Sequence, residues 1–325
     1  MVHQVDSTST GSAVSCSPPG RAKVGLARRF LELIRFSHTL FALPFAALAC
    51  VLATASPRSV ELSTTLWCSR LIGVLLCMVT ARSAAMAFNR LVDARIDAAN
   101  PRTARRHIPA GDLSSRQVWV FFVGMCGLFV LACLLFLPNW LPIVGSVPVL
   151  AWICGYSFAK RFTSAAHLWL GFALALSPVC AWIALRGETV IDNPSDLYPA
   201  ICLGLAIAFW VAGFDIIYAC QDADFDRTQK LHSIPARFGV TGALRIAAGL
   251  HTAMLLVLCC LPRFLDLKLG WLYWAALGGV AVLVITQHAL VSAEDLGRVN
   301  TAFFQVNAVI SFGFCFLVGI DCWLG

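Results

Sequence analysis

Nine long apolar segments constrain the fold of this sequence more than any other feature. Each holds about 20 residues, the length that an α-helix needs to cross a hydrocarbon core of roughly 30 Å at a rise of 1.5 Å per residue. We therefore predict an all-α, polytopic membrane protein with nine transmembrane helices. The segments lie at residues 37–56, 64–88, 118–137, 140–159, 165–185, 197–219, 242–261, 270–291 and 301–321.

The composition supports a membrane protein and excludes three other classes. Hydrophobic residues make up 59% of the 325 residues and charged residues only 13%, against about 25% charged in an average soluble domain. A soluble enzyme, a disordered regulator and a coiled coil are excluded, because an apolar outer surface is stable only in a bilayer. The 14 cysteines lie mostly inside the apolar segments and form no CxxC pair. We interpret them as small buried hydrophobic residues.

The distribution of positive charge predicts the topology. Residues 1–20 are rich in Ser, Thr, Gly and Pro, so we expect a disordered tail there and one transmembrane domain over 21–325. Of the 24 Lys and Arg residues, 18 lie in the N-terminal stretch, in every second connection or, for Arg245, in the first turn after such a connection. The positive-inside rule then places the N-terminus in the cytoplasm and the C-terminus outside the inner (cytoplasmic) membrane. This asymmetry accounts for the net charge of +7 without a nucleic-acid partner, and the sequence indicates no obligate protein partner.

Two charged connections, 89–117 and 220–241, resemble each other and are predicted to share the cytoplasmic face. Each has two aspartates four residues apart, a basic stretch about ten residues further on and an Ile-Pro pair near its end. The first begins NRLVDARID and the second begins YACQDADFD. We interpret the likeness as a weak internal repeat that supplies two half-sites facing each other.

The aspartates of the two connections predict a metal site. Residues four apart lie on one face of a helix, so each group forms a polar stripe at the end of a membrane helix. Like charges at this spacing destabilise a helix unless a cation lies between them, and Mg²⁺ prefers carboxylate oxygens together with water and phosphate. The stripes consist of Asn89, Asp93 and Asp97 at the end of the second helix and Tyr218, Asp222 and Asp226 at the end of the sixth.

Basic residues near both stripes predict a diphosphate ligand, which Mg²⁺ would bridge to the carboxylates. The sequence has no GxxxxGK[ST] loop, which argues against nucleotide hydrolysis. The expected substrate carries a diphosphate at the membrane surface and a tail that prefers lipid, and an isoprenyl diphosphate meets both demands. The basic residues are Arg102, Arg105, Arg106, Lys160, Arg161, Arg227 and Lys230.

These motifs resemble those of the UbiA superfamily of intramembrane aromatic prenyltransferases, over about residue 30 to the C-terminus. NRLVDARID (89–97) and DIIYACQDADFD (215–226) look like the two aspartate-rich motifs of that family, and YSFAKRFT (156–163) looks like its Tyr/Lys loop. The resemblance implies a bundle of nine helices around a central cavity that is open to lipid. The stretches RFSHTLFALPFA and LHSIPARFG look most like 4-hydroxybenzoate polyprenyltransferases and related enzymes of menaquinone synthesis.

The resemblance implies Mg²⁺-dependent transfer of a polyprenyl group from a prenyl diphosphate to an aromatic acceptor such as 4-hydroxybenzoate in quinone biosynthesis. A dihydroxynaphthoate of menaquinone biosynthesis is the alternative acceptor. At 105–108 the chain reads RRHI where relatives more often have a lone Arg followed by Pro-Leu, so the sequence leaves open whether Arg105 or Arg106 faces the phosphate. The implied ligands of Mg²⁺ and diphosphate are Asn89, Asp93, Asp97, Asp222 and Asp226, and the implied substrate-binding residues include Arg102, Tyr156, Lys160 and Tyr218.

Two charged residues lie deeper in the predicted helices. Arg82 precedes Asn89 by seven residues, and Asp215 precedes Asp222 by seven, so each occupies the same helix face two turns, about 10 Å, further into the membrane. An intramembrane charge usually faces the bundle interior and marks a functional site. We expect Asp215 to be catalytic and Arg82 to bind substrate, with a structural ion pair between the two helices as the alternative.

The remaining candidates are less distinctive. Arg35, just before the first helix, is expected to bind an acceptor carboxylate or to act as a positive-inside anchor. A carrier of lipid or anions is the alternative function from another class, but we find no matched helices broken by Gly or Pro at the midplane, which are typical of carriers. We interpret His38, His167 and His288 as structural, and we expect Phe88, Phe172, Trp210 and Phe214 to shield an allylic cation.

Overall fold

The computed structural model describes residues 25–34, 43–56 and 63–324, and every predicted apolar segment is helical within these ranges. Eight helical spans are long and apolar enough to cross a membrane, and a ninth apolar helix, α2 (Leu43–Ala55), is shorter as described. The described residues contain no β-strand. The prediction of an all-α, polytopic membrane fold is therefore confirmed, while the tail predicted at 1–20 lies outside the described residues.

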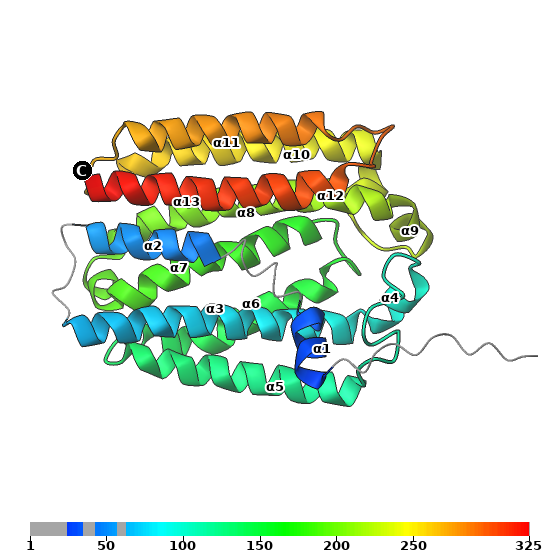
Figure 1. The fold of residues 1–325 in the computed structure, drawn as a ribbon, viewed down its shortest axis with the longest axis horizontal. Coiled ribbons are helices and arrows are strands. Elements are labelled where there is room, and N and C mark those ends of the chain that lie inside the picture. Colours follow the sequence, from blue (N-terminus) through cyan, green and yellow to red (C-terminus); the bar gives the residue numbers. More distant parts are fainter. Residues whose placement is uncertain (1–24, 35–42, 57–62, 325) are drawn as a thin grey trace, which may run out of the picture.

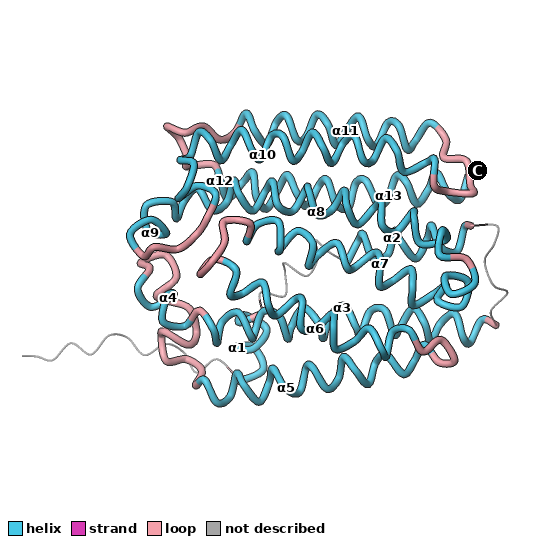
Figure 2. Tube along the Cα trace, turned by 180° about the vertical axis from the view of Figure 1, so that it is seen from behind, coloured by secondary structure: helices cyan, strands magenta, loops and turns pink. Residues whose placement is uncertain are grey.

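Successive long helices run in opposite directions through the bundle (Figures 1 and 2). Two short helices, α4 (Ala94–Ala99) and α9 (Ala223–Thr228), lie together at one end, and the C-terminus lies at the other end (Figure 1). The long helices are α3 (Thr64–Val92), α5 (Ser115–Ala132, followed by the 3₁₀ turn η2, Cys133–Phe136), α6 (Leu141–Ala159), α7 (Ala166–Asp192), α8 (Tyr198–Ala219), α10 (Ile234–Cys260), α11 (Trp271–Ala289) and α13 (Asn307–Leu324, preceded by α12, Val299–Thr301, and the π-helical turn η6, Ala302–Val306).

Helix α8 forms the centre of the bundle. In its most apolar stretch 78% of the residues are buried, whereas no other spanning helix exceeds 39%. Its neighbours come close because small residues lie at the contacts: a Cβ added to Gly171 of α7 would lie 2.3 Å from the carbonyl oxygen of Ala208, and one on Gly204 would lie 2.9 Å from that of Ala175. Lipid gives helices little hydrophobic reason to associate, so close backbone packing of this kind is what holds membrane helices together.

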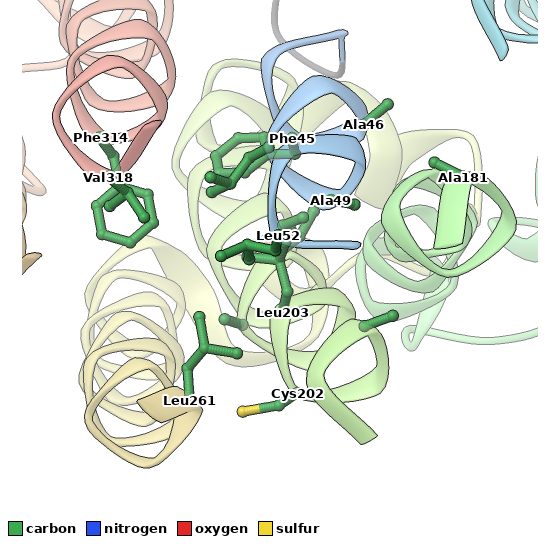
Figure 3. Close-up of a cluster of buried hydrophobic side chains, with 14 of the residues drawn as sticks. Phe45, Ala46, Ala49, Leu52, Ala181, Cys202, Leu203, Leu261, Phe314 and Val318 are labelled. Atoms are coloured by element: carbon green, nitrogen blue, oxygen red, sulfur yellow. The ribbon is translucent and has the colours of Figure 1, made fainter. Parts of the chain in front are cut away.

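A buried apolar cluster joins α8 to the helices around it. Side chains of α2, α8, the end of α10 and α13 meet in this cluster, which Figure 3 shows in part. The cluster extends along α8 as far as Val211 and Phe214. Its members include Phe45, Leu52, Leu203, Leu261 and Val318.

Helix α1 (Leu26–Leu33) was not predicted from the sequence. One face of α1 buries Leu33 in a cluster with Ala87 and Leu113. Arg29 Nη1 donates a hydrogen bond of 2.8 Å to the backbone carbonyl of Asp112. The helix is amphipathic and lies across the bundle rather than along it (Figure 1).

The end of the bundle opposite α4 and α9 contains a buried ion pair. Arg186 interrupts the regular geometry of α7 and pairs with Asp196, with Nη2 2.6 Å from Oδ1 and Nε 2.9 Å from Oδ2. Trp182 Nε1 donates to the same carboxylate, and Arg186 Nη1 donates to the carbonyl of Ala53. Both charges are almost fully buried, so each depends on the other for neutralisation.

We predict that Asp196→Asn destabilises the protein by roughly 3 kcal/mol or more, because it leaves the Arg186 guanidinium buried without a counter-charge. Thermal unfolding in detergent measures the effect. Asp224→Asn is the matched control, since the Asp224 side chain is 99% exposed and its loss barely shifts the melting temperature. Equal melting temperatures for the two variants would contradict the prediction.

Candidate active site

A polar cavity of about 300 Å³ opens at the end of the bundle that carries α4 and α9. Its walls come from α3, α4, α6, α7, α8, α9 and η6, so segments more than 200 residues apart in the chain contribute to it. Arg35 lies outside the described residues. Eleven of the other predicted site residues line the cavity, namely Arg82, Asn89, Asp93, Asp97, Arg102, Tyr156, Lys160, Asp215, Tyr218, Asp222 and Asp226.

The first aspartate motif departs from the continuous helical stripe that was predicted. Helix α3 ends at Val92, because Asp93 takes φ −91° and ψ 4°, and Asp97 lies on the separate helix α4. Backbone bonds still link Asp93 N to Asn89 O and Asp97 N to Asp93 O. Asn89 Nδ2 donates a 2.8 Å bond to Asp93 Oδ2. After this break, Asp97 contacts Arg106 of the loop that follows α4.

The second motif is interrupted in a similar way. Helix α8 ends at Ala219, a 3₁₀ turn η4 covers Cys220–Asp222, and Asp226 lies on α9. Asp222 and Asp226 are both buried. The predicted stripe of three residues on one helix is therefore wrong for both motifs, although both motifs do place their carboxylates in one cavity.

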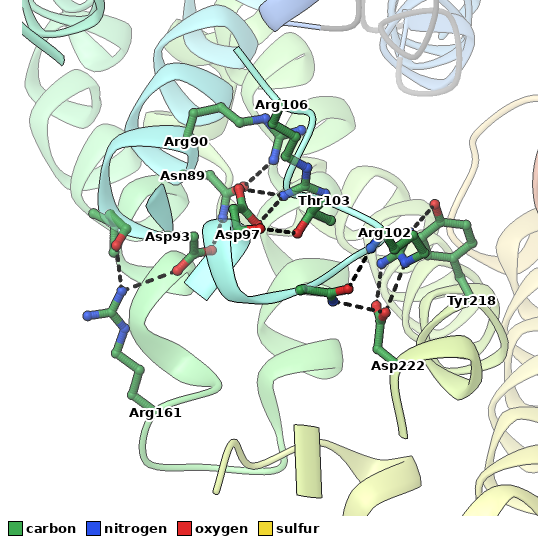
Figure 4. A network of polar contacts seen from close by, with 12 residues as sticks. Asn89, Arg90, Asp93, Asp97, Arg102, Thr103, Arg106, Arg161, Tyr218 and Asp222 are labelled. Carbon is green, nitrogen blue, oxygen red and sulfur yellow. Dashed lines mark hydrogen bonds and ion pairs between the residues drawn. The ribbon is translucent and has the colours of Figure 1, made fainter. Parts of the chain in front are cut away.

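Arg102 joins the two half-sites (Figure 4). Its guanidinium pairs with both carboxylate oxygens of Asp222, and Nη1 donates a 2.9 Å bond to the hydroxyl of Tyr218. Asn100 Nδ2 donates to Asp222 Oδ1, while Asn100 Oδ1 accepts from the Arg102 backbone N–H. Burial lowers the pKa of Arg102, but Asp222 and Tyr218 raise it by more, so that the net pKa lies above the usual value.

Two further arginines pair with the first motif. Arg106 Nη1 lies 2.7 and 2.8 Å from the two oxygens of Asp97, and Arg161 Nη2 lies 3.2 Å from Asp93 Oδ1. Burial raises the pKa of Asp93; Arg161 lowers it by less, and the negative charge of Asp97 adds to the rise. Arg106 thus faces the cavity and Arg105 is exposed, a choice that the sequence left open.

Asp226 has a buried carboxylate oxygen that is not satisfied. Its Oδ2 is buried without a hydrogen-bond partner, and the nearest cation, Lys160 Nζ, is 3.9 Å away. An unsatisfied buried carboxylate oxygen is costly, and a hard cation would satisfy it. In the part of the chain that the structure describes, no three His, Cys, Asp or Glu side chains converge on one point. Mg²⁺ does not need such a cage, because it commonly takes one or two carboxylates and completes its shell with water and phosphate.

A second, apolar cavity of about 320 Å³ continues from the polar one between α3, α5, α6 and α7. Arg82 and Tyr156 line both cavities. Arg82 Nε is buried without a hydrogen-bond partner, and among the described residues Arg82 forms no ion pair with Asp215. Asp215 instead bonds to Nδ1 of His167 at 2.7 Å. The structural ion pair proposed as the alternative for Arg82 and Asp215 is therefore absent from this structure.

Sequence reasoning missed several residues of the site. His167 was interpreted as structural, yet it contacts Asp215; Asn100 was not considered, although an Asn-Pro turn beside a motif is a usable signal. Phe303 lines the cavity, with its ring centroid 4.4 Å from that of Tyr218 and 5.1 Å from that of Phe214. Nothing in the local sequence connects Phe303 with the site, because it follows Tyr218 by 85 residues.

Of the four aromatic residues that were expected to shield a cation, only Phe214 lines either cavity. Phe88 packs against Trp119, Phe122 and Phe158 instead. Phe172 is 41% exposed, and Trp210 is buried beside Phe214 but lines neither of these two cavities. Of the predicted basic residues, Arg227 and Lys230 are exposed and do not line the cavity.

Known proteins resemble this chain in sequence and fold. The model of the UbiA prenyltransferase family matches residues 42–309. A protein of Xanthomonas oryzae pv. oryzae (strain PXO99A) named 4-hydroxybenzoate octaprenyltransferase is 31% identical over 242 residues, which cover 74% of this chain and 75% of the relative. One of Methylococcus capsulatus with the same name is 28% identical over 226 residues, 70% of this chain and 73% of the relative.

Solved structures agree with these sequence relatives. The apo structure of a UbiA homologue from Aeropyrum pernix K1 superposes with a TM-score of 0.75 at 28% identity and covers 89% of this chain and 98% of that one. A UbiA homologue from Archaeoglobus fulgidus, bound to DMAPP and Mg²⁺, has a TM-score of 0.63 at 18% identity and covers 90% and 98%. At that identity the second structure supports the fold alone.

We predict that Mg²⁺ with inorganic diphosphate raises the melting temperature of the detergent-solubilised protein, because ligands that bind only the folded state stabilise it. Asp226→Asn removes the stabilisation, since it replaces the unsatisfied carboxylate oxygen with a neutral amide. Asp224→Asn, on the same short helix but exposed, keeps it. If Asp226→Asn retained the full shift, Asp226 would not be a metal ligand.

Proposed function

Because the chain belongs to the UbiA prenyltransferase family, we propose that it transfers a polyprenyl group from a prenyl diphosphate to the ring of 4-hydroxybenzoate, in an Mg²⁺-dependent step of quinone biosynthesis. The observation that carries the proposal is the pair of joined cavities: one lined by two aspartate motifs and six cationic side chains, the other almost wholly apolar. A diphosphate head fits the first and an isoprenoid tail fits the second. The names of the sequence relatives support the hydroxybenzoate acceptor.

The diphosphate would bind among the cations that now pair with the aspartates. Arg102, Arg106 and Arg161 each contact a motif carboxylate, and Lys160 lies near Asp226. When bound, Mg²⁺ supplies positive charge that offsets the charge of the departing diphosphate. Asn89, Asp93, Asp97, Asp222 and Asp226 would hold it. The homologue of the same fold from Archaeoglobus fulgidus is bound to Mg²⁺ and DMAPP, which agrees with these two classes of ligand.

The reaction requires that the allylic C1–O bond breaks and that C1 bonds to a ring carbon of the acceptor. Phe214, Tyr218 and Phe303 form an aromatic wall of the polar cavity, where they exclude water and present ring faces to a developing cation. Arg82, at the junction of the cavities, would bind the acceptor carboxylate with its unsatisfied guanidinium. This placement would bring the acceptor ring beside C1.

Asp215 is the proposed general base. It takes the proton of the acceptor hydroxyl, so that the phenolate pushes electrons into the ring as the ring carbon attacks C1. The ring C–H proton then leaves to solvent, Asp215 returns its proton to the oxygen, and aromaticity is restored. The net products are prenylated phenol, diphosphate and one proton.

The tests distinguish two alternative functions from the proposed one. A dihydroxynaphthoate also presents a carboxylate and an activated ring, so it is the alternative acceptor, as in menaquinone biosynthesis. A lipid or anion carrier would bind the same ligands without turnover. Acceptor-dependent release of diphosphate from a prenyl diphosphate separates enzyme from carrier, and parallel assays with the two acceptors separate the enzymes.

We further propose that the protein lies in the inner (cytoplasmic) membrane with the site facing the cytoplasm, the N-terminus inside and the C-terminus outside. The excess of Lys and Arg on one set of connections supports this orientation. The C-terminus lies at the end of the bundle opposite α4 and α9 (Figure 1), as the proposed orientation requires.

We predict that Asp93→Asn and Asp222→Asn each abolish prenyl transfer while the protein stays folded, because each removes a metal ligand rather than a packing contact. Acceptor-dependent turnover and thermal unfolding are measured together, and chelation of divalent cations mimics both variants. A variant that retains more than about a tenth of the wild-type kcat, a barrier increase below ~1.4 kcal/mol, would not have lost a metal ligand.

We predict that Lys160→Ala and Arg82→Gln each raise KM for a different substrate. Lys160→Ala raises KM for the prenyl diphosphate and barely alters that for the acceptor, since Lys is a point-charge partner for phosphate. Arg82→Gln raises KM for the carboxylated acceptor. Each variant is the control for the other, and steady-state kinetics with each substrate varied in turn measure the effects. If Lys160→Ala instead raised KM for the acceptor and Arg82→Gln raised KM for the prenyl diphosphate, the two binding roles would have to be exchanged.

A further inference from the structure

The imidazole of His167 is the unexplained group nearest to the proposed chemistry. His167 is the second residue of α7 and is completely buried, and its Nδ1 lies 2.7 Å from Asp215 Oδ2 on the neighbouring helix α8. The Asp215 side chain is 22% exposed and lines the polar cavity, whereas His167 does not line it. His167 therefore contacts Asp215 from outside the polar cavity, on the side away from the proposed substrate.

The contacts of His167 define which ring nitrogen carries the proton. Its Nε2 lies 3.5 Å from the backbone N–H of Ile234, and because a backbone N–H can only donate, Nε2 must accept. In a neutral imidazole the other nitrogen then carries the hydrogen. Nδ1–H accordingly donates to Asp215 Oδ2.

The first turn of α10 places the Ile234 N–H against the imidazole. Ile234–Phe238 form a short helical stretch that ends at a kink within α10, where Gly239 takes φ 71° and ψ 169°. A hydrogen on Nε2 would point at the Ile234 N–H, so this contact favours the lone pair on Nε2 and, with it, the donation from Nδ1 to Asp215.

Three parts of the chain fix the ring in place. Gly171, one turn after His167, allows α7 to approach the carbonyl of Ala208 on α8. The start of α10 is held by Ser233, whose Oγ accepts from the Ala236 N–H. The loop before it is held by a 2.7 Å bond from the His232 N–H to the carbonyl of Lys160. The imidazole thus has one orientation, and so does the carboxylate that it contacts.

We propose that His167 is a positioning residue for Asp215, which directs one carboxylate oxygen toward the hydroxyl of the aromatic acceptor. The Nδ1–H bond holds Oδ2, and Oδ1, which has no hydrogen-bond partner among the described residues, is the oxygen that receives the hydroxyl proton. His167 keeps its own proton throughout. This inference rests on the proposed function and adds to it a residue outside both aspartate motifs.

Side-chain geometry provides a selective test. The amide nitrogen of Asn occupies nearly the position of histidine Nδ1, whereas that of Gln occupies nearly the position of Nε2. His167→Asn therefore keeps the donor to Asp215, while His167→Gln and His167→Leu lose it. His288→Asn is the matched control, because His288 is a partly buried histidine of the same bundle that bonds to His251 and does not line the cavity.

The experiment measures kcat and KM for both substrates, with thermal unfolding in detergent to verify folding. We expect His167→Gln and His167→Leu to lower kcat by about tenfold or more, a part of the roughly 10²-fold or larger effect of a general base, with KM for the prenyl diphosphate unchanged. His167→Asn should stay within about threefold of wild type, a barrier change below ~0.7 kcal/mol. His288→Asn should have the wild-type kcat.

Two results would overturn the role of His167. One is a wild-type kcat in a folded Gln or Leu variant, and the other is an Asn variant as impaired as the Gln variant at equal melting temperature. If His167→Leu does not fold, the comparison of kcat between His167→Asn and His167→Gln still tests the role of His167. Failure of the proposed function is a separate result, since wild-type protein would then release no diphosphate in response to any aromatic acceptor.

Discussion

The rest of the site depends on the neutralisation of carboxylates at one end of an apolar bundle. Asp97, Asp222 and Asp226 are buried, and burial of an unpaired carboxylate is strongly unfavourable. Arg106 neutralises the first and Arg102 the second. Because Arg102 follows the first motif and Asp222 belongs to the second, the ion pair that neutralises one half-site also joins it to the other.

The same ion pairs indicate how a diphosphate would bind in the cavity. The arginines that contact the aspartates are the cations best placed for phosphate oxygens, and Arg recognises carboxylate and phosphate with the same planar fork of donors. A diphosphate that arrives with Mg²⁺ brings negative charge for the arginines and positive charge for the carboxylates. In the proposed function, binding would therefore be an exchange of partners within a site that stays close to neutral, and Asp226 Oδ2, which has no hydrogen-bond partner, would gain most from it.

The polar end relies on close packing in the membrane. Helices α7 and α8 approach closely because Gly171 and Gly204 lack side chains, and this approach brings His167 within hydrogen-bond distance of Asp215. The first turn of α10 then meets the same imidazole. Backbone packing between three helices thus controls the direction of one carboxylate in the cavity.

The helical membrane fold could be predicted from the amino-acid sequence, because segments of about 20 apolar residues have few other stable states. The sequence also identified most of the charged residues that line the cavity, since a charge within an apolar helix usually faces the bundle interior. Tertiary structure alone decided how these residues pair. Local spacing did not reveal that both motifs break their helices at Asp93 and near Asp222, that Arg106 rather than Arg105 faces inward, or that Phe303 and His167 join the site. Each of these depends on where another helix, distant in the chain, places its backbone and its charges, and a periodic pattern carries no such information.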